Sequence, residues 1–169
     1  MGKELCTPAA RRDILMEQPF WKVKSLGEMT EREWEALCCN CGICCLHRFR
    51  EGRSGKAFIT SVACRHLDLN SCRCRIYDRR FRIERDCKKI SPDNIFKLRW
   101  LPKTCGYRTV AQGRDLSPWH PLLSGDSESV HQAGISIRNK GIISELDIVA
   151  GDLLKYLLTQ PLGLSRRKT

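Results

Sequence analysis

The sequence predicts a small α+β domain, irregular and rich in helices, that is organised around one or more metal centres with cysteine ligands. The first observation is the cysteine content, because the chain has 11 Cys among 169 residues and begins its main run at Cys38. The second is a lean core: 41% of the residues are hydrophobic but only 7% are aromatic, so bound metal would help the core to hold. The third is that helix and strand signals alternate along the chain.

A single domain suits this chain length, and we place it at residues 19–158. The polar residues 1–18 are expected to form an N-terminal arm, and residues 159–169 a basic C-terminal tail. Charged side chains between residues 1 and 16 argue against a secretory signal, and no later apolar run is long enough to span a bilayer. We therefore expect a cytoplasmic protein with no membrane partner.

The first half of the domain contains one helix start and one strand. Thr30 followed by Glu33 predicts a capping box, and the helix that begins there carries Trp34 and Leu37 on one face and leads to Cys38. Gly42 gives the chain the freedom to turn around a metal. The β-branched and aromatic residues 57–62 predict a strand that leads to Cys64.

The second half alternates between helix signals and turn residues. Ser91 and Pro92 predict a helix that ends near Trp100, whereas residues 112–134 are rich in Gly, Pro, Ser and Asp and predict a loop. Residues 135–138 alternate as a brief strand would. From Ser144 to residue 158, leucines at helical spacing predict an amphipathic helix that covers the core, with partner binding as the alternative.

The cysteines are the candidate metal ligands. Nine of them form the predicted set: Cys38, Cys41, Cys44, Cys45, Cys64, Cys72, Cys74, Cys87 and Cys105. Two-residue gaps let successive thiolates converge on one centre, as in bacterial ferredoxins, while the adjacent Cys44 and Cys45 would serve different ions or form a bridge. Cys39 faces away from Cys38, and Cys6 stands apart, so we leave both out. Nine ligands predict two sites, or one cluster and a separate ion, with a spare thiol.

Metal ligation is favoured over disulfides, because the cytoplasm is reducing and the number of cysteines is odd. An iron–sulfur cluster of the 4Fe–4S type and zinc both accept shells made only of cysteine. The two-residue spacing, the excess of cysteines and the few histidines favour iron–sulfur. A mixed zinc shell would need His47 or His66, for which we expect hydrogen bonds to a thiolate or the backbone instead. The centre would have a structural or redox-sensing role.

A basic segment offers an alternative function. Eight Lys and Arg side chains lie between residues 73 and 89: Arg73, Arg75, Arg79, Arg80, Arg82, Arg85, Lys88 and Lys89. Interleaved with Tyr77 and Phe81, they predict weak binding of nucleic acid. The competing interpretation is that the guanidinium groups offset thiolate charge, since eight thiolates around two divalent ions would add about −4 to the formal charge of +11.

An enzymatic role has less support. His120 and Asp115 could be drawn as an acid–base pair, but His120 between two prolines suits a structural turn better. Cys72 and Cys74 could form a redox pair, although the βαβ pattern that accompanies cytosolic redox motifs is missing. Phosphate loops and nucleophile elbows are absent from the sequence. We therefore assign no reaction.

Several motifs in one order carry a family resemblance. They are Cys38-x-x-Cys41-x-x-Cys44-Cys45-Leu-His47, Val62-Ala-Cys64-Arg-x-Leu67, Cys72-Arg-Cys74-Arg-x-Tyr77-x-Arg79-Arg80-Phe81, Asp86-Cys87, Trp100-Leu-Pro102, Thr104-Cys105-x-Tyr107-Arg108 and Trp119-His-Pro-Leu-Leu123. From about Pro19 to Glu145 the chain resembles the bacterial YcgN/YkgJ-like cysteine-cluster family, and the long reach to Cys87 resembles its YcgN-like branch. The resemblance implies a zinc- or iron-chelating domain and no particular reaction.

Overall fold

A computed structural model describes residues 18–52, 57–149 and 151–158. Cys6, the expected tail at 159–169 and the expected arm, apart from residue 18, lie outside the described residues. Short helices dominate the described part: α1 (Phe20–Val23), α2 (Glu31–Ala36), α3 (Arg80–Ile83), α4 (Gly106–Ala111), α5 (Pro121–Ser124) and α6 (Ser129–Gln132). Turns of 3₁₀ helix cover Ile43–Cys45, Tyr77–Arg79, Ile95–Lys97, Glu145–Asp147 and Asp152–Tyr156.

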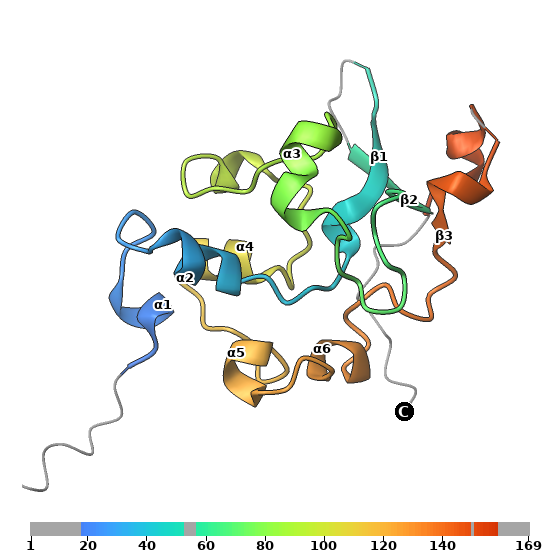
Figure 1. Cartoon of the computed structure of the whole chain (residues 1–169). Coiled ribbons are helices and arrows are strands. Elements are labelled where there is room, and N and C mark those ends of the chain that lie inside the picture. The colour runs from blue at the N-terminus through green and yellow to red at the C-terminus, as the bar shows by residue number, and fades with distance from the viewer. Residues whose placement is uncertain (1–17, 53–56, 150, 159–169) are drawn as a thin grey trace, which may run out of the picture.

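A three-stranded sheet completes the fold, so the predicted α+β class is confirmed. Its strands are β1 (Leu46–Arg50), β2 (Ala57–Ala63) and β3 (Ile143–Ser144), in the order β1-β2-β3. β1 and β2 are antiparallel with a register shift between Leu46 and Arg48, whereas β2 and β3 are parallel. Figure 1 shows α1, α2 and α4 on one side of the molecule and the sheet on the other, with α3 above and α5 and α6 below.

The capping box at the start of α2 is confirmed. The Glu33 amide donates to the Thr30 hydroxyl at 3.2 Å, and the Glu33 carboxylate accepts from the Thr30 amide at 2.8 Å. Trp34 and Leu37 are buried on the inner face, where the Trp34 indole donates to the Ile90 carbonyl at 2.9 Å and its ring lies 4.9 Å from that of Tyr107. Local capping and apolar burial together fix the direction in which the chain leaves α2 toward the cysteine run.

Two clusters of buried residues form the core. The first joins α2 to α4 and the segment before it, with Trp34, Leu37, Leu101 and Cys105 among its members. The second lies behind the sheet and contains three cysteines: Cys39, Cys41 and Cys72. The cysteine run contacts both clusters, because Cys38 and Cys44 pack against the first and Cys39 and Cys41 belong to the second.

The strand predicted at 57–62 is confirmed, but the helix predicted from Ser91 to Trp100 is wrong. Only the 3₁₀ turn Ile95–Lys97 forms there. The Asn94 side chain accepts from the Ser91 amide at 3.0 Å and donates to the Lys89 carbonyl at 2.8 Å. Side-chain bonds of this kind offer the backbone a turn in place of a helical ladder.

The loop predicted at 112–134 and the strand predicted at 135–138 also need correction. α5 and α6 form within the expected loop, because Pro121 stands at the first helical position of α5 and the His120 imidazole caps the Leu122 amide at 3.2 Å. Residues 135–138 are turn and bend. Their contact with the cysteine run is the Ile137 amide, which donates to the Cys41 carbonyl at 2.9 Å, and one such bond does not make a strand.

The prediction of a long helix from Ser144 to residue 158 is wrong as well. The Ser144 hydroxyl caps the Leu146 amide as predicted, but only a 3₁₀ turn follows, and Gly151 adopts φ +97° before a second one. Beyond it the chain returns to β2, where the Leu158 amide donates to the Ile59 carbonyl at 2.9 Å. Pairing with the strand wins over helix propensity, so Val149 is 73% exposed instead of covering the core.

A tight contact fixes the end of α2 against the start of α4. His120 is buried, and its Nε2 lies 3.1 Å from the Leu37 carbonyl oxygen while its Nδ1 accepts from Leu122. Nε2 therefore carries the proton and donates it to Leu37. A Cβ atom at Gly106 would lie 2.0 Å from the same carbonyl oxygen and 2.9 Å from His120 Nε2, so only glycine fits there.

Gly106→Ala should lower the free energy of unfolding by about 3 kcal/mol, because the added methyl must displace a backbone carbonyl. Gly27→Ala is the matched control, since a Cβ there meets nothing within 4 Å. Chemical denaturation of both variants measures the difference. Equal stability of Gly106→Ala and Gly27→Ala would contradict the close packing of Leu37 against α4.

Candidate metal centre

The cysteine run leaves α2 through two turns that need unusual backbone angles. Asn40 has φ +54° and Gly42 φ +76°, after which the 3₁₀ turn Ile43–Cys45 leads into β1. A Cβ at Gly42 would also lie 2.9 Å from the Ile137 side chain. Gly42 thus uses the backbone freedom expected of it, in a turn between Cys38 and Cys44, whereas a metal inside that turn stays a prediction.

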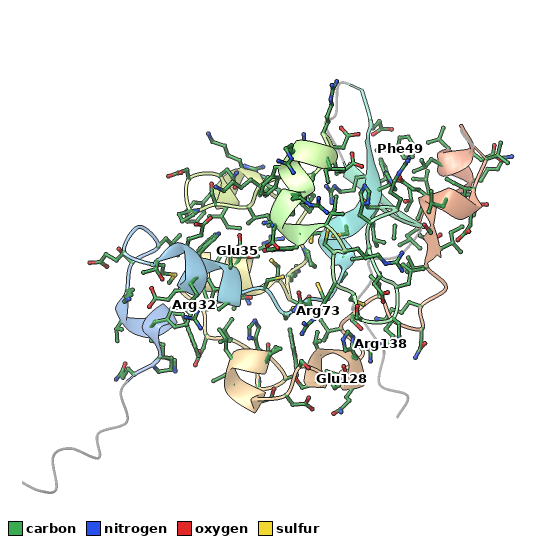
Figure 2. All side chains as sticks on the ribbon, viewed as in Figure 1. Arg32, Glu35, Phe49, Arg73, Glu128 and Arg138 are labelled. Carbon is green, nitrogen blue, oxygen red and sulfur yellow. The ribbon has the colours of Figure 1, made fainter. Side chains whose placement is uncertain are left out.

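A cavity of about 480 Å³ lies where the run meets β1, the 64–75 loop and the segment around α3. Six of the nine predicted ligands line it: Cys38, Cys44, Cys45, Cys64, Cys74 and Cys87. All six are partly exposed. Figure 2 shows sulfur atoms gathered near the middle of the molecule, between α2 and β1. Residues from separate parts of the sequence thus bring their thiols to one space.

Four thiols form an inner group, which we define as Cys38, Cys41, Cys44 and Cys105. The contact between Leu37 and Gly106 places Cys38 beside Cys105. Burial, followed by repulsion from Cys44, Cys41 and Cys105, raises the pKa of the Cys38 thiol. Burial raises the pKa of Cys105 to about 12, with Cys41 and Cys44 adding to the shift. Cys38 therefore feels the charge of the other three members, and Cys105 feels that of Cys41 and Cys44.

Four further thiols form an outer group, Cys45, Cys64, Cys74 and Cys87. The Cys64 amide donates to the Cys45 carbonyl at 2.9 Å, and a bridge between Leu67 and Cys74 folds the next loop back toward Cys64. Burial raises the pKa of Cys87, and the charges of Cys74, Cys44 and Cys64 act in the same direction. The outer group thus lies on the side of the cavity formed by the sheet and the α3 segment.

Cys44 and Cys45 join the two groups. Their Sγ atoms are 3.9 Å apart. The hydrogen bond from Cys45, together with the charges of Arg48 and Arg80, lowers the pKa of Cys44 against the effect of burial. The same bond and burial raise the pKa of Cys45. Cys44 is therefore the thiol most easily ionised of the two.

The remaining cysteines of the run and loop lie elsewhere. Cys39 and Cys72 are buried in the second core cluster with Cys41 and do not line the cavity. The Cys72 thiol, at a residue with φ +56°, donates weakly to the Leu69 carbonyl at 3.9 Å. Because Cys72 is in the core and Cys74 in the cavity wall, they do not form the redox pair considered above.

Two histidines line the cavity, each next to a carboxylate. His47 hydrogen-bonds through Nε2 to Glu145, which also accepts from Arg65, and His66 Nε2 lies 3.8 Å from Glu84. Against the effect of burial, the bonds from Arg65 and His47 lower the pKa of Glu145. The Glu145 carboxylate is therefore an anion that orients the His47 ring.

Arg48 and Arg80 bring positive charge to the cavity. Arg48 donates to the Cys44 carbonyl at 2.9 Å, with its guanidinium 3.5 Å from the centroid of the Trp100 ring. Arg80 stacks on Tyr77 at 3.5 Å and lies 3.4 Å from the Glu35 carboxylate, which also accepts from the Tyr77 hydroxyl. Figure 2 labels Glu35 between α2 and α3.

Sequence reasoning missed Arg48, Glu35 and Glu145 as site residues. Arg48 follows the cysteine run by three positions, and that closeness was the one local signal available. Glu35 and Glu145 act through contacts 42 and 98 positions away, which no local pattern indicates.

The acid–base pair considered for His120 is not formed. His120 is buried with both ring nitrogens engaged, as its structural interpretation predicted. Asp115 lies apart from it, 2.6 Å from the Lys22 ammonium and 3.0 Å from the Trp21 indole nitrogen. These partners tie α1 to the rest of the domain.

The donor chemistry fits a soft metal, since thiols and imidazoles face one cavity. Among residues 18–52, 57–149 and 151–158, however, no group of three or more His, Cys, Asp or Glu side chains is arranged so that it could hold a metal ion. In the same part of the chain, none of the helices has the length and apolar character that a bilayer span requires.

Comparison with known proteins decides the family. A protein of Rhizobium etli named UPF0260 protein is 49% identical over 90% of this chain and 96% of its own length. The chain belongs to the UPF0260 family. Proteins of that name from Sinorhizobium medicae and Rhizobium meliloti are 50% and 49% identical, each over 89% of this chain and 96% of their own length. No family model and no solved structure matches the chain.

The expected membership in the YcgN/YkgJ-like family is wrong, because these bacterial relatives carry the UPF0260 name and not that one. The zinc- or iron-chelating property that the resemblance implied loses that support. What remains is the chemistry of the cysteines in this chain.

In reduced, metal-free protein, alkylation of Cys44 should begin at lower pH than alkylation of Cys64. The bond from Cys45 and two nearby guanidinium groups lower the pKa of Cys44, whereas burial raises that of Cys64. Mass spectrometry of iodoacetamide-labelled peptides across roughly pH 6 to 10 measures both profiles. Arg48→Gln should move the Cys44 profile to higher pH and leave Cys64 in place; the reverse order of the two cysteines would contradict the assignment.

Proposed function

We propose that the UPF0260 chain is a metal-binding protein whose cysteines hold an iron–sulfur cluster or zinc. The observation that carries this proposal is the convergence of six thiols on one cavity, with Cys105 in the core cluster against which Cys38 and Cys44 pack and with Cys41 close enough for its charge to act on Cys38. Thiols from five separate stretches have no shared packing role that would require one cavity. Ligation of a soft metal would explain why these thiols share one cavity.

The inner and outer groups supply eight ligands in this proposal, enough for two four-thiolate sites within the 19–158 domain. Cys44 and Cys45 then serve different centres, which removes the difficulty of two adjacent residues reaching one ion. Cys72 is the spare thiol, because it lies in the core and, unlike Cys41, is not among the charges that raise the pKa of Cys38 and Cys105. Ionised, reduced thiolates suit a reducing compartment, so we place the protein in the cytoplasm.

We favour an iron–sulfur cluster because of the two-residue spacing and the number of thiols. Partial exposure of all six cavity cysteines adds a structural reason, since a centre that senses redox state must be reached from the surface, whereas a structural ion can be enclosed. A bound cluster would supply one-electron chemistry. The chain's own residues would position it, with Arg48 and Arg80 offsetting thiolate charge.

Zinc is the second candidate, and one observation favours it. A histidine that binds a metal usually engages its other ring nitrogen with a carboxylate. His47 with Glu145 has this arrangement at the cavity wall, whereas His66 Nε2, 3.8 Å from Glu84, is too far away for a hydrogen bond. Mixed shells of cysteine and histidine are characteristic of zinc.

Anaerobic purification of the full chain, followed by metal and sulfide analysis and a visible spectrum, tests the proposal. Brown protein with iron and acid-labile sulfide is the expected result, and colourless protein with stoichiometric zinc supports the second candidate. Protein that is free of both metals, and fully folded by circular dichroism and thermal unfolding, would overturn metal binding altogether.

Paired alanine variants test the division into two groups. Cys38→Ala/Cys105→Ala should remove the metal of the inner group, and Cys64→Ala/Cys74→Ala that of the outer group, so each loses about half of the bound metal. Cys39→Ala is the matched control and should keep all of the metal, because Cys39 belongs to neither group of proposed ligands. Metal analysis on folded protein is the measurement. A full loss in both double variants would show a single centre instead of two.

A further inference from the structure

The structure separates the eight basic side chains between residues 73 and 89 into two kinds. Arg80 turns into the cavity, where it stacks on Tyr77 and pairs with Glu35. Arg75 pairs with Asp68 at 3.2 Å. Figure 2 shows Arg73 lower in the molecule, toward Glu128 and Arg138. Because of these partners and positions, we do not count Arg73, Arg75 and Arg80 as part of a common basic surface.

The other five are exposed and follow one another around α3 and the turn after it. We call them the basic rim: Arg79, Arg82, Arg85, Lys88 and Lys89. Within the described residues, none of the five forms an ion pair. Between residues 79 and 89 six Lys and Arg side chains outnumber Glu84 and Asp86, so this surface has a net positive charge that attracts polyanions.

Thiolate charge does not account for the basic rim. A cation that offsets a thiolate must lie close to the sulfur, because screening weakens the interaction at longer range. Of the rim, only Lys88 lines the cavity, whereas Arg48 on β1 and the inward-turned Arg80 already lower the pKa of Cys44. Arg48 and Arg80 therefore already offset the thiolate charge, as the competing interpretation of the basic segment requires. The five rim residues are not needed for that purpose.

Aromatic rings accompany these cations. Tyr77 and Phe81 are 41% and 43% exposed, and the Arg80 guanidinium lies 3.5 Å and 4.3 Å from their ring centroids. The guanidinium therefore lies against both rings, which stay partly exposed. Bases of a single strand stack on such rings in a way that does not depend on sequence.

We propose that the basic rim, with Phe81 and Tyr77, binds single-stranded nucleic acid. Phosphates contact Arg79, Arg82 and Arg85, and an unpaired base stacks on Phe81. The rings give the single strand an advantage over a duplex, whose bases are already stacked, and over an acidic protein segment, which has no bases. This proposal does not depend on the metal, since the rim lies outside the candidate ligand set.

Fluorescence anisotropy with a labelled oligothymidine of about 15 nucleotides tests the rim on full-length protein as purified. Arg82→Glu should weaken binding about fivefold and reduce the slope of log affinity against log salt by about 1. Arg32→Glu is the matched control: it changes the same charge on an exposed, unpaired helical arginine of the described chain, and Figure 2 shows it on the side of α2 away from α3. Equal effects of the two variants would overturn the rim as the binding surface.

Phe81→Ala tests the stacking and should weaken the single strand at least about fivefold, the lower range for one stacked base. Its metal content should match that of the unaltered protein, which separates this outcome from a failure of the metal centre. Absence of binding at low salt would overturn the proposal. So would equal affinity for poly-glutamate or for a duplex of the same length, since either would show attraction by charge alone.

Discussion

The buried hydrogen bond from His120 Nε2 to the Leu37 carbonyl holds the candidate site together. Leu37 ends α2 just before the cysteine run, and Gly106 opens α4 just after Cys105, with no room between them for a side-chain carbon. His120 comes from a third segment and is locked by its second bond to the Leu122 amide. Cys38 and Cys105 are therefore neighbours because of backbone packing, before any metal is considered.

Sequence patterns predicted those elements whose signal and partner lie within a few residues of each other. The capping box of Thr30 and Glu33 is such a case, and so is the turn at Gly42. Where a distant partner competes, local patterns failed. The leucines after Ser144 have helical spacing, but the chain there pairs with β2, and the contact between Leu158 and Ile59 spans most of the domain. Periodicity carries no information about such a partner.

The candidate site shows the same division. The number and spacing of the cysteines made it possible to predict them as a set. Which of them share a cavity depends on how the loops fold back, and the bridge between Leu67 and Cys74 holds one such loop. The net charge also did not show which basic residues lie near the thiols, because a guanidinium beside a sulfur and one in solvent add the same charge to the total. Only the structure separates Arg80, turned inward onto Tyr77, from Arg82 on the surface.

Crowding of the thiols links metal binding to protons. Burial raises the pKa of Cys38, Cys64 and Cys105, so without metal these groups stay neutral near pH 7 and can pack closely without repulsion. Metal ligation requires thiolates, and each such cysteine must release its proton when the centre forms. Cys44 is the exception, because Cys45 and two guanidinium groups favour its ionised form. In the proposed metal centre, an incoming cation would first meet the Cys44 thiolate at the junction of both groups, and its charge would then favour ionisation of the neighbouring thiols.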